Sequence, residues 1–253
     1  NGLGGYMALT AAFSVNRCDA GVLVAAKVAP NDRLSLVHRL KEEMTIGGKR
    51  VFLSSQGFAD GTTEEDGYTR LSSFTVEHVP TWVYHAGGVQ VMRRAAMAYE
   101  ENAVCVTYAI DNQTDAACTL RITPYLRFTP KETAIEKPCI FVYKDGCVTA
   151  NGHALYTGTN GDVAETEPDW QRLAYPEDEK DGRPDSGMAG ACFEITRNVR
   201  AGEKDLLELV FSFGKTKLTA QEMMTAQTAR RQAIEHGCGL ADPVARQLAL
   251  AAD

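Results

Sequence analysis

The sequence predicts an all-β fold built from two antiparallel sheets, followed by helix at the C-terminal end. Runs of alternating or continuous apolar residues recur between turn signals at short intervals from residue 20 to residue 213, which is typical of a β-sandwich or barrel. With 253 residues and 44% hydrophobic content, the chain can bury about three quarters of its unfolded surface. That is enough for one large β domain or two small ones.

Three turn pairs predict β-hairpins along the first part of the chain. Each pair contains glycine and separates two apolar runs, and glycine accepts the positive φ that a primed turn requires. The pairs are Gly47-Gly48, Gly87-Gly88 and Asp145-Gly146.

Two consecutive strands are predicted to pair as an antiparallel ladder with one buried face. Residues 104–110 place four apolar side chains on one face of the first strand. After the turn at residues 111–114, residues 118–122 alternate in the same way. One buried face and one polar face are expected of such a pair.

The segment from Gly158 to Gly190 lacks both the strand period and the helix period. It is rich in Gly, Pro, Asp and Glu, so we expect a long surface loop that crosses between strands. Loops of this length are usually functional or mobile. A further strand is expected at Leu206–Phe211.

A helix is expected to follow this last strand. Thr219 and Glu222 have the spacing of a capping box, and the helix should run to about His236, where Gly237 can take the left-handed C-terminal position. The helix is mostly polar, which predicts a linker lying on the sandwich or between domains. Asp242-Pro243 offers the start of another helix.

The chain begins without Met and stops inside a helical-looking run, Gln247–Asp253. We therefore expect it to be a piece of a longer protein.

Composition and charge argue against several classes of partner. The net charge is −7, and nine acidic against three basic residues between positions 162 and 185 account for most of it. With no Lys/Arg stripe to meet a phosphate backbone, nucleic acid is not an expected partner. No 18-residue apolar stretch or signal peptide is visible, so no membrane span is expected.

The cysteines and histidines predict neither a disulfide framework nor a metal site. Seven cysteines form an odd number without a Cys-x-x-Cys motif, and most lie in alternating apolar runs. A reduced cytoplasm is the simplest setting. The five histidines never approach metal-ligand spacing, and no cofactor motif is complete.

No pair of carboxylates is arranged as expected for glycosidase catalysis. Such a pair faces a bond from two sides, about 6.5 to 9.5 Å apart in inverting enzymes and about 5 Å in retaining ones. Glu42-Glu43, Glu64-Glu65 and Glu100-Glu101 are neighbours in sequence instead, and neighbours on a strand point to opposite faces. We therefore expect no catalytic residue and interpret these pairs as solvated surface at strand ends.

The acidic residues Asp178, Glu179 and Asp181 are hard oxygen donors at close spacing. They lack the order of a calcium loop, so a solvated charge run is the preferred interpretation.

Five aromatic residues are candidates for contact with sugar. Trp82 and Tyr84 lie two apart and share a strand face, which suits stacking on a pyranose ring, although aromatic pairs of this kind are more often core. Tyr6, Trp170 and Tyr175 lie in glycine-rich or loop sequence and are freer to meet a ligand.

Five segments carry a resemblance to a known family. In order and spacing they resemble the N-terminal domain of bacterial and archaeal glycogen debranching enzymes (amylo-alpha-1,6-glucosidases), with a good match over roughly the first half. The segments are Asn1–Tyr6, Arg17–Ala26, Arg39–Glu43, Phe74–Trp82 and Glu101–Tyr108.

The resemblance implies a β-supersandwich, the galactose-mutarotase-like architecture shared with aldose mutarotases, placed before a helical (α/α) barrel that holds the catalytic acids. Residues 1–218 would form the supersandwich. Residues 219–253 would form a linker helix and the start of the barrel, which Leu248–Asp253 resembles.

Two matched positions and two departures concern the family's polar residues. Arg17 and Arg39 sit at matched positions, where an arginine can hold a sugar hydroxyl, an interdomain carboxylate or an acid of its own domain. The family usually has Arg-Tyr-His-Gly where this chain has Cys18-Asp-Ala-Gly21, and Arg-Asp-Tyr-His where it has Thr129-Pro-Lys-Glu132.

The resemblance implies a non-catalytic domain that packs against the downstream catalytic domain of the same polypeptide and contacts branched α-glucan, the substrate of α-1,6 hydrolysis. A stand-alone mutarotase-like enzyme is an alternative, with His153 and Glu165 or Glu167 as its acid and base. The same architecture would also suit a purely structural module, or the leading domain of a glucoamylase or disaccharide phosphorylase.

Overall fold

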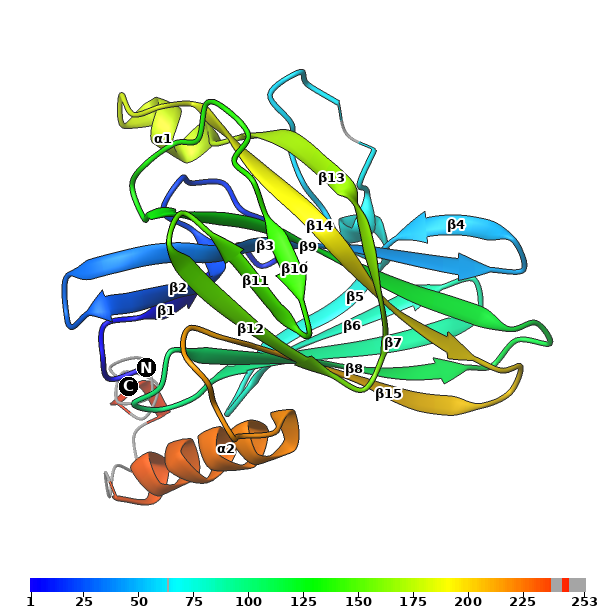
Figure 1. Ribbon diagram of the computed structural model, residues 1–253. Coiled ribbons are helices and arrows are strands. Elements are labelled where there is room, and N and C mark those ends of the chain that lie inside the picture. Colours follow the sequence, from blue (N-terminus) through cyan, green and yellow to red (C-terminus); the bar gives the residue numbers. More distant parts are fainter. Residues whose placement is uncertain (63, 238–242, 246–253) are drawn as a thin grey trace.

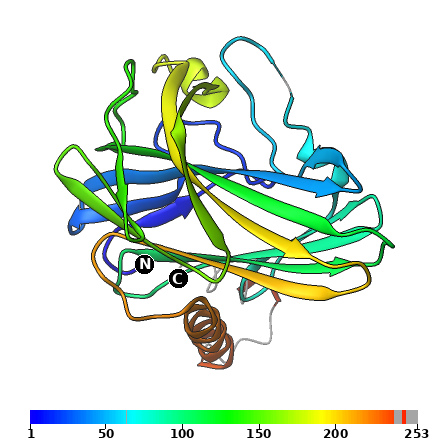
Figure 2. The ribbon, with the colours of Figure 1, turned by 45° about the vertical axis from the view of Figure 1, so that its right-hand side comes forward.

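The computed structural model describes residues 1–62, 64–237 and 243–245. Its strands form two antiparallel sheets that pack face to face (Figures 1 and 2), with one continuous apolar core between them. The predicted all-β, two-sheet supersandwich is confirmed.

The first sheet has seven strands in the order β1-β2-β3-β9-β14-β13, with β4 paired to β3. Its strands are β1 (Tyr6–Ala8), β2 (Gly21–Val28), β3 (Asp32–Ile46), β4 (Lys49–Phe52), β9 (Cys118–Pro130), β13 (Asp162–Ala174) and β14 (Ser186–Val199).

The second sheet has eight strands in the order β10-β11-β12-β15-β8-β7-β6-β5. Its strands are β5 (Leu71–Val76), β6 (Pro80–Ala86), β7 (Val89–Met97), β8 (Ala103–Asn112), β10 (Val142–Lys144), β11 (Cys147–Ala150), β12 (His153–Thr159) and β15 (Lys204–Ser212). The helical elements are a 3₁₀ turn, η1 (Gly67–Arg70), and two helices, α1 (Pro176–Lys180) and α2 (Ala220–Gly237).

All three predicted hairpins are present. They join β3 to β4, β6 to β7 and β10 to β11. Both residues of each turn pair have positive φ, as the primed-turn argument requires.

The predicted ladder between residues 104–110 and 118–122 is wrong. The first segment is β8, which pairs with β7 and β15, whereas the second belongs to β9, which pairs with β3 and β14. The chain crosses from one sheet to the other between them, so their apolar faces meet across the sandwich core instead of side by side. Alternation shows which face is buried but not which strand is the neighbour.

The predicted loop at Gly158–Gly190 is also wrong over most of its length. Residues 162–174 form β13, and residues from 186 onward begin β14. Because β13 is the edge strand of its sheet and its first eight residues are exposed, it carries no alternating apolar signal. Only the connection around α1 remains irregular.

The helix α2 covers part of the outer face of the eight-stranded sheet (Figure 1). Its buried Met223 and Met224 pack against residues of β7 and β8. The capping box is confirmed: Thr219 N donates to Glu222 Oε2 at 2.8 Å, and Glu222 N donates to Thr219 Oγ1 at 3.2 Å. Gly237 is helical rather than left-handed. The expected helix start at Asp242 and the segment Leu248–Asp253 lie outside the described residues.

Candidate functional site

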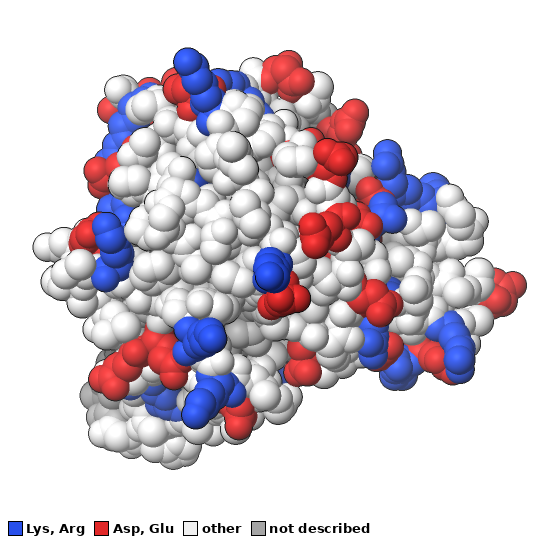
Figure 3. Space-filling model, in the orientation of Figure 1, with Lys and Arg blue, Asp and Glu red and all other residues white. Residues whose placement is uncertain are grey.

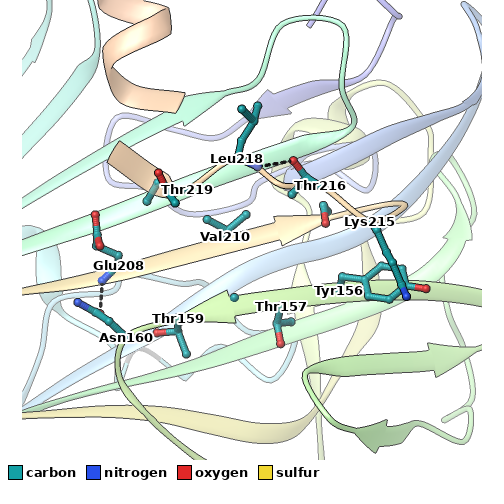
Figure 4. A pocket seen from close by; sticks show the side chains of 13 residues that line it. Tyr156, Thr157, Thr159, Asn160, Glu208, Val210, Lys215, Thr216, Leu218 and Thr219 are labelled. Atoms are coloured by element: carbon teal, nitrogen blue, oxygen red, sulfur yellow. Dashed lines mark hydrogen bonds between the residues drawn. The ribbon is translucent and has the colours of Figure 1, made fainter. Parts of the chain in front are cut away.

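A groove lies on the outer face of the eight-stranded sheet, between β12, β15 and the segment that leads into α2 (Figure 4). Its volume is about 480 Å³. We refer to it as the β12–β15 groove. Its lining residues are Tyr156, Thr157, Gly158, Thr159, Asn160, Glu208, Val210, Ser212, Lys215, Thr216, Leu218, Thr219 and Ala220.

Strand register explains which side chains face the groove. Tyr156 pairs with Ser212, and Gly158 pairs with Val210. Since alternate side chains point to opposite faces of a sheet, these positions point away from the sandwich core, while Leu209 and Phe211, which alternate with them on β15, are fully buried in it.

The hollow exists because position 158 has no side chain. A Cβ placed there would meet only the Cβ of Val210, at 3.8 Å. Val210, the partner of Gly158 on β15, therefore forms an apolar part of the groove floor. Leu218 and Thr219 line the side toward α2 (Figure 4).

Hydrogen bonds hold one end of the groove in place, and a cation and an aromatic ring meet at the other. The Asn160 side chain donates to the Leu206 carbonyl at 2.9 Å and accepts from the Glu208 backbone N–H at 2.8 Å. At the other end, Lys215 Nζ lies 5.8 Å from the centre of the Tyr156 ring. The lining contains one carboxylate and one ammonium group, so the groove is close to neutral.

A second polar cluster is buried between the two sheets. Arg93 Nη1 donates to Glu42 Oε2 at 2.5 Å, and the Tyr108 hydroxyl donates to Glu42 Oε1 at 2.6 Å. Arg93 also donates to the Tyr84 hydroxyl at 2.6 Å. Burial, followed by the charge of Glu42, raises the pKa of Tyr108 well above its ordinary value, so the phenol stays a donor.

A third cluster lies on the outer side of the seven-stranded sheet. Arg39 Nη2 binds both carboxylate oxygens of Glu65, at 2.6 and 2.5 Å. The His38 imidazole shares a hydrogen bond of 2.9 Å with the Tyr175 hydroxyl. The ion pair within the domain, one of the interpretations of Arg39, is the contact observed.

The interpretation of the paired glutamates as solvated surface is wrong for three residues. Glu42, Glu43 and Glu65 are 0%, 5% and 4% exposed. Glu42 and Glu43 lie inside the long strand β3, and each of the three has an arginine within ion-pair distance. Neighbouring positions do face opposite sides, as predicted, but both sides of β3 are covered.

Three of the six predicted sugar-contact residues are buried. Trp82 and Tyr84 are 3% and 1% exposed and lie in the core, the place that aromatic pairs of this kind more often take. The Trp82 indole donates to the Ala11 carbonyl at 2.8 Å. Tyr175 is 0% exposed, so its expected place in an exposed loop is wrong. It belongs to a buried cluster with Leu173 and Ala189, and its ring meets that of His38 edge-on.

The other three candidates are partly exposed. The Tyr6 hydroxyl donates to the Asp19 carbonyl at 2.7 Å. Trp170 stacks on Phe141, with ring centres 5.1 Å apart. Arg17 binds two acids beside α1, Asp178 at 3.2 Å and Asp181 at 2.6 Å. None of the six residues lines the β12–β15 groove.

Sequence reasoning missed the groove because Gly158 marked the start of the expected loop. The signal available was Tyr156-x-Gly158, which places a ring and a gap on one strand face directly before Asn160.

The residues named for a mutarotase-like reaction lie on different sheets. His153 is on β12, with its ring 6.1 Å from that of Phe213. Glu165 and Glu167 are on the exposed part of β13.

In the part of the chain that the structure describes, no group of three metal-ligating side chains gathers. Two of the acids at 178–181 bind Arg17. The six cysteines described are free thiols, and none of the described helices combines the length and apolar character needed to cross a membrane.

The surface seen in the orientation of Figure 1 carries a broad uncharged area over β10–β12 (Figure 3). Acidic and basic side chains are mixed around it, and neither sign forms a continuous stripe on this face.

Residues 1–205 match a family model described as glycogen debranching enzyme N terminal. A search of curated proteins found no match. Among solved structures, the chain is similar to the heparan sulfate lyase HepC from Pedobacter heparinus, at 9% identity and a TM-score of 0.40, over 69% of this chain and 24% of that chain.

Two further structures are similar to this chain. A bacterial glucoamylase complexed with acarbose has 11% identity and a TM-score of 0.37, over 90% of this chain and 34% of that one. A putative kojibiose phosphorylase from human microbiome has 9% identity and a TM-score of 0.33, over 80% and 26%. The chain therefore spans about a quarter to a third of the length of these proteins.

Proposed function

The chain belongs to the glycogen debranching enzyme N-terminal family, and from that premise we propose that it is the non-catalytic leading domain of a glycogen debranching enzyme. The parent reaction in this proposal is hydrolysis of α-1,6 glucosidic branch points. The domain would pack against the catalytic domain of the same polypeptide and contact branched α-glucan.

The state of the buried carboxylates supports a non-catalytic role. Glycoside hydrolysis needs two carboxyl groups on either side of one bond. Glu42, Glu65 and Asp178 are each held by an arginine of the domain, and the β12–β15 groove is lined by a single carboxylate, that of Glu208. This is the observation that carries the proposal: the acids that the fold buries are occupied as ion-pair partners.

The position of α2 supports a connection to a following domain. The helix buries Met223 and Met224 on the sheet, while most of its other residues are exposed or half-buried. We assign residues 1–218 to the β domain and residues from 219 onward to a linker that leads into a helical catalytic barrel.

The free thiols described above are consistent with a reducing compartment. We therefore propose a cytoplasmic setting and a role in glycogen metabolism.

Glucose release from a branched limit dextrin tests the proposal. The complete gene product that contains this chain should release glucose, and the purified 253-residue chain should not. A complete gene product with both predicted barrel carboxylates replaced serves as the inactive control. Glucose release by the 253-residue chain alone would overturn the non-catalytic assignment, and an inactive complete product would overturn the debranching assignment.

A further inference from the structure

We propose that the β12–β15 groove is a binding site for a short, neutral segment of α-glucan. The inference rests on the proposed function for the choice of α-glucan and on the groove itself for the site. It places sugar contact on the outer face of the eight-stranded sheet, away from the aromatic residues that the sequence suggested.

The groove has the size and shape of a small-molecule site. Its volume of about 480 Å³ lies within the range of about 300 to 1,000 Å³ that is usual for ligand pockets. Gly158 leaves the middle of the groove open, Tyr156 lies on the same face of β12, and Asn160 follows directly after the end of that strand. A chain of sugar units can therefore lie along the strand direction.

The lining matches the two kinds of surface that a pyranose presents. Val210, Leu218 and the ring of Tyr156 offer apolar contact, which suits the face of a sugar ring. At the two ends, the Glu208 carboxylate can accept hydrogen bonds and the Lys215 ammonium group can donate them. Within the described residues no ion pair involves either group, so both charges can meet hydroxyl groups.

The charge of the groove argues for a neutral ligand. One acid and one base oppose each other across the lining. Recognition of phosphate or sulfate groups instead uses clusters of arginine and lysine. A neutral oligosaccharide therefore fits this surface better than a phosphorylated or sulfated one.

The walls are held before any ligand arrives. Asn160 ties the end of β12 to β15 through two hydrogen bonds. Opposite, Thr216 donates to Glu101 at 2.7 Å, and the Thr219–Glu222 capping box fixes the entry to α2. A site that needs little ordering loses less free energy on binding.

Gly158→Leu is the variant that tests the site most directly. Its side chain would fill the groove, and the glycine has an ordinary φ with its nearest Cβ neighbour at 3.8 Å, so the strand should tolerate it. Binding of maltoheptaose to the 253-residue chain, measured by NMR titration, should weaken at least tenfold, while Tm should change little.

Gly57→Leu is the matched control. Gly57 is also exposed, also has an ordinary φ, and its Cβ would lie 3.9 Å from that of Ala174 on the other sheet. This variant should bind maltoheptaose as the unmodified chain does. Tyr156→Ala should weaken binding at least tenfold, whereas Tyr156→Phe should retain most of it, because the ring makes the contact.

Three outcomes would overturn the proposal. The unmodified chain could fail to bind maltoheptaose at millimolar concentration, or Gly158→Leu could bind it unchanged. A sulfated oligosaccharide could bind more tightly than maltoheptaose. If Gly158→Leu leaves sugar binding intact but weakens binding of the separately expressed downstream domain, the groove is a protein contact instead.

Glucose release by the complete gene product is measured independently, so failure of the groove proposal and failure of the proposed function are distinguishable.

Discussion

Arg93 of β7 and Glu42 of β3 join the two sheets through the middle of the sandwich. Their charged atoms lie 2.5 Å apart, and neither side chain has any exposed surface. The Arg93 guanidinium also lies 3.7 Å from the centre of the Phe13 ring. A fully desolvated ion pair therefore lies in the middle of the sandwich core.

Removing either member of this pair should destabilise the fold strongly. Arg93→Met or Glu42→Leu leaves a buried charge without its partner, and the free energy of unfolding should fall by about 3–5 kcal/mol. The double variant removes both charges and should be more stable than either single variant. Urea unfolding measures all three.

The control for this series is the half-buried pair between Arg197 and Asp205, whose side chains are each 29% exposed. Arg197→Met should cost only about 0.2–1 kcal/mol. A double core variant less stable than both single variants would contradict the argument.

His38 should make stability depend on pH. Its side chain is fully buried, and burial, followed by the charge of Arg127, holds its pKa well below the ordinary value. In the unfolded chain the same imidazole takes up a proton as pH falls through about 6.5. The unfolded state then binds more protons, so the contribution of His38 to stability is fully present above that pH and is lost below it.

Between pH 7.5 and 5.5 this one group should reduce the free energy of unfolding by about 1.4 kcal/mol. His38→Gln should lack that part of the pH dependence, and urea unfolding at the two pH values measures it. His85→Gln changes an exposed histidine and should keep the pH dependence of the unmodified chain. Equal pH dependence in His38→Gln and the unmodified chain would show that His38 is not buried as a neutral group.

Asp178 should hold α1 against the loop before β2. Its buried carboxylate accepts a hydrogen bond from the Cys18 backbone N–H at 2.6 Å and lies 3.2 Å from Arg17 Nη1. Asp178→Ala should lower the free energy of unfolding by about 1.5–3 kcal/mol, the usual worth of hydrogen bonds to a charged group.

Limited proteolysis gives a second measurement of this contact. Cleavage between residues 175 and 185 should be faster in Asp178→Ala, because the local opening of that segment costs less free energy. Asp181→Ala removes an exposed partner of the same arginine and should have a much smaller effect. Comparable cleavage rates in the two variants would contradict the argument that Asp178 holds α1 against the loop before β2.

The stacked rings of Trp170 and Phe141 should require glycine at position 190, because they leave no room for a Cβ there. A Cβ at position 190 would lie 2.6 Å from Trp170 Cε2 and 2.7 Å from Phe141 Cε2. Gly190→Ala should therefore cost about 1–3 kcal/mol by overpacking and alter the tryptophan fluorescence. Gly158→Ala adds the same methyl group where nothing is crowded and should stay within about 0.5 kcal/mol. An unchanged stability in Gly190→Ala would mean that the two rings move apart freely.

Local features of the fold could be predicted from the sequence. The hairpin at Gly87-Gly88 and the Thr219–Glu222 capping box depend on residues only a few positions apart, so their geometry is already present in a short peptide pattern. Alternation likewise placed Trp82 and Tyr84 together on one strand face. It did not reveal what covers that face, and the structure shows that it is the sandwich core.

By itself, then, the sequence determined the all-β class, the hairpins, the capped helix and the family. Only the tertiary structure decided that β8 and β9 face each other across the core, that Glu42 and Glu65 are buried against arginines, and that Gly158 opens a groove beside α2. The physical reason is that burial and pairing depend on residues far apart in the chain. The alternation of side chains along a strand is the same whichever strand pairs with it and whatever covers its faces.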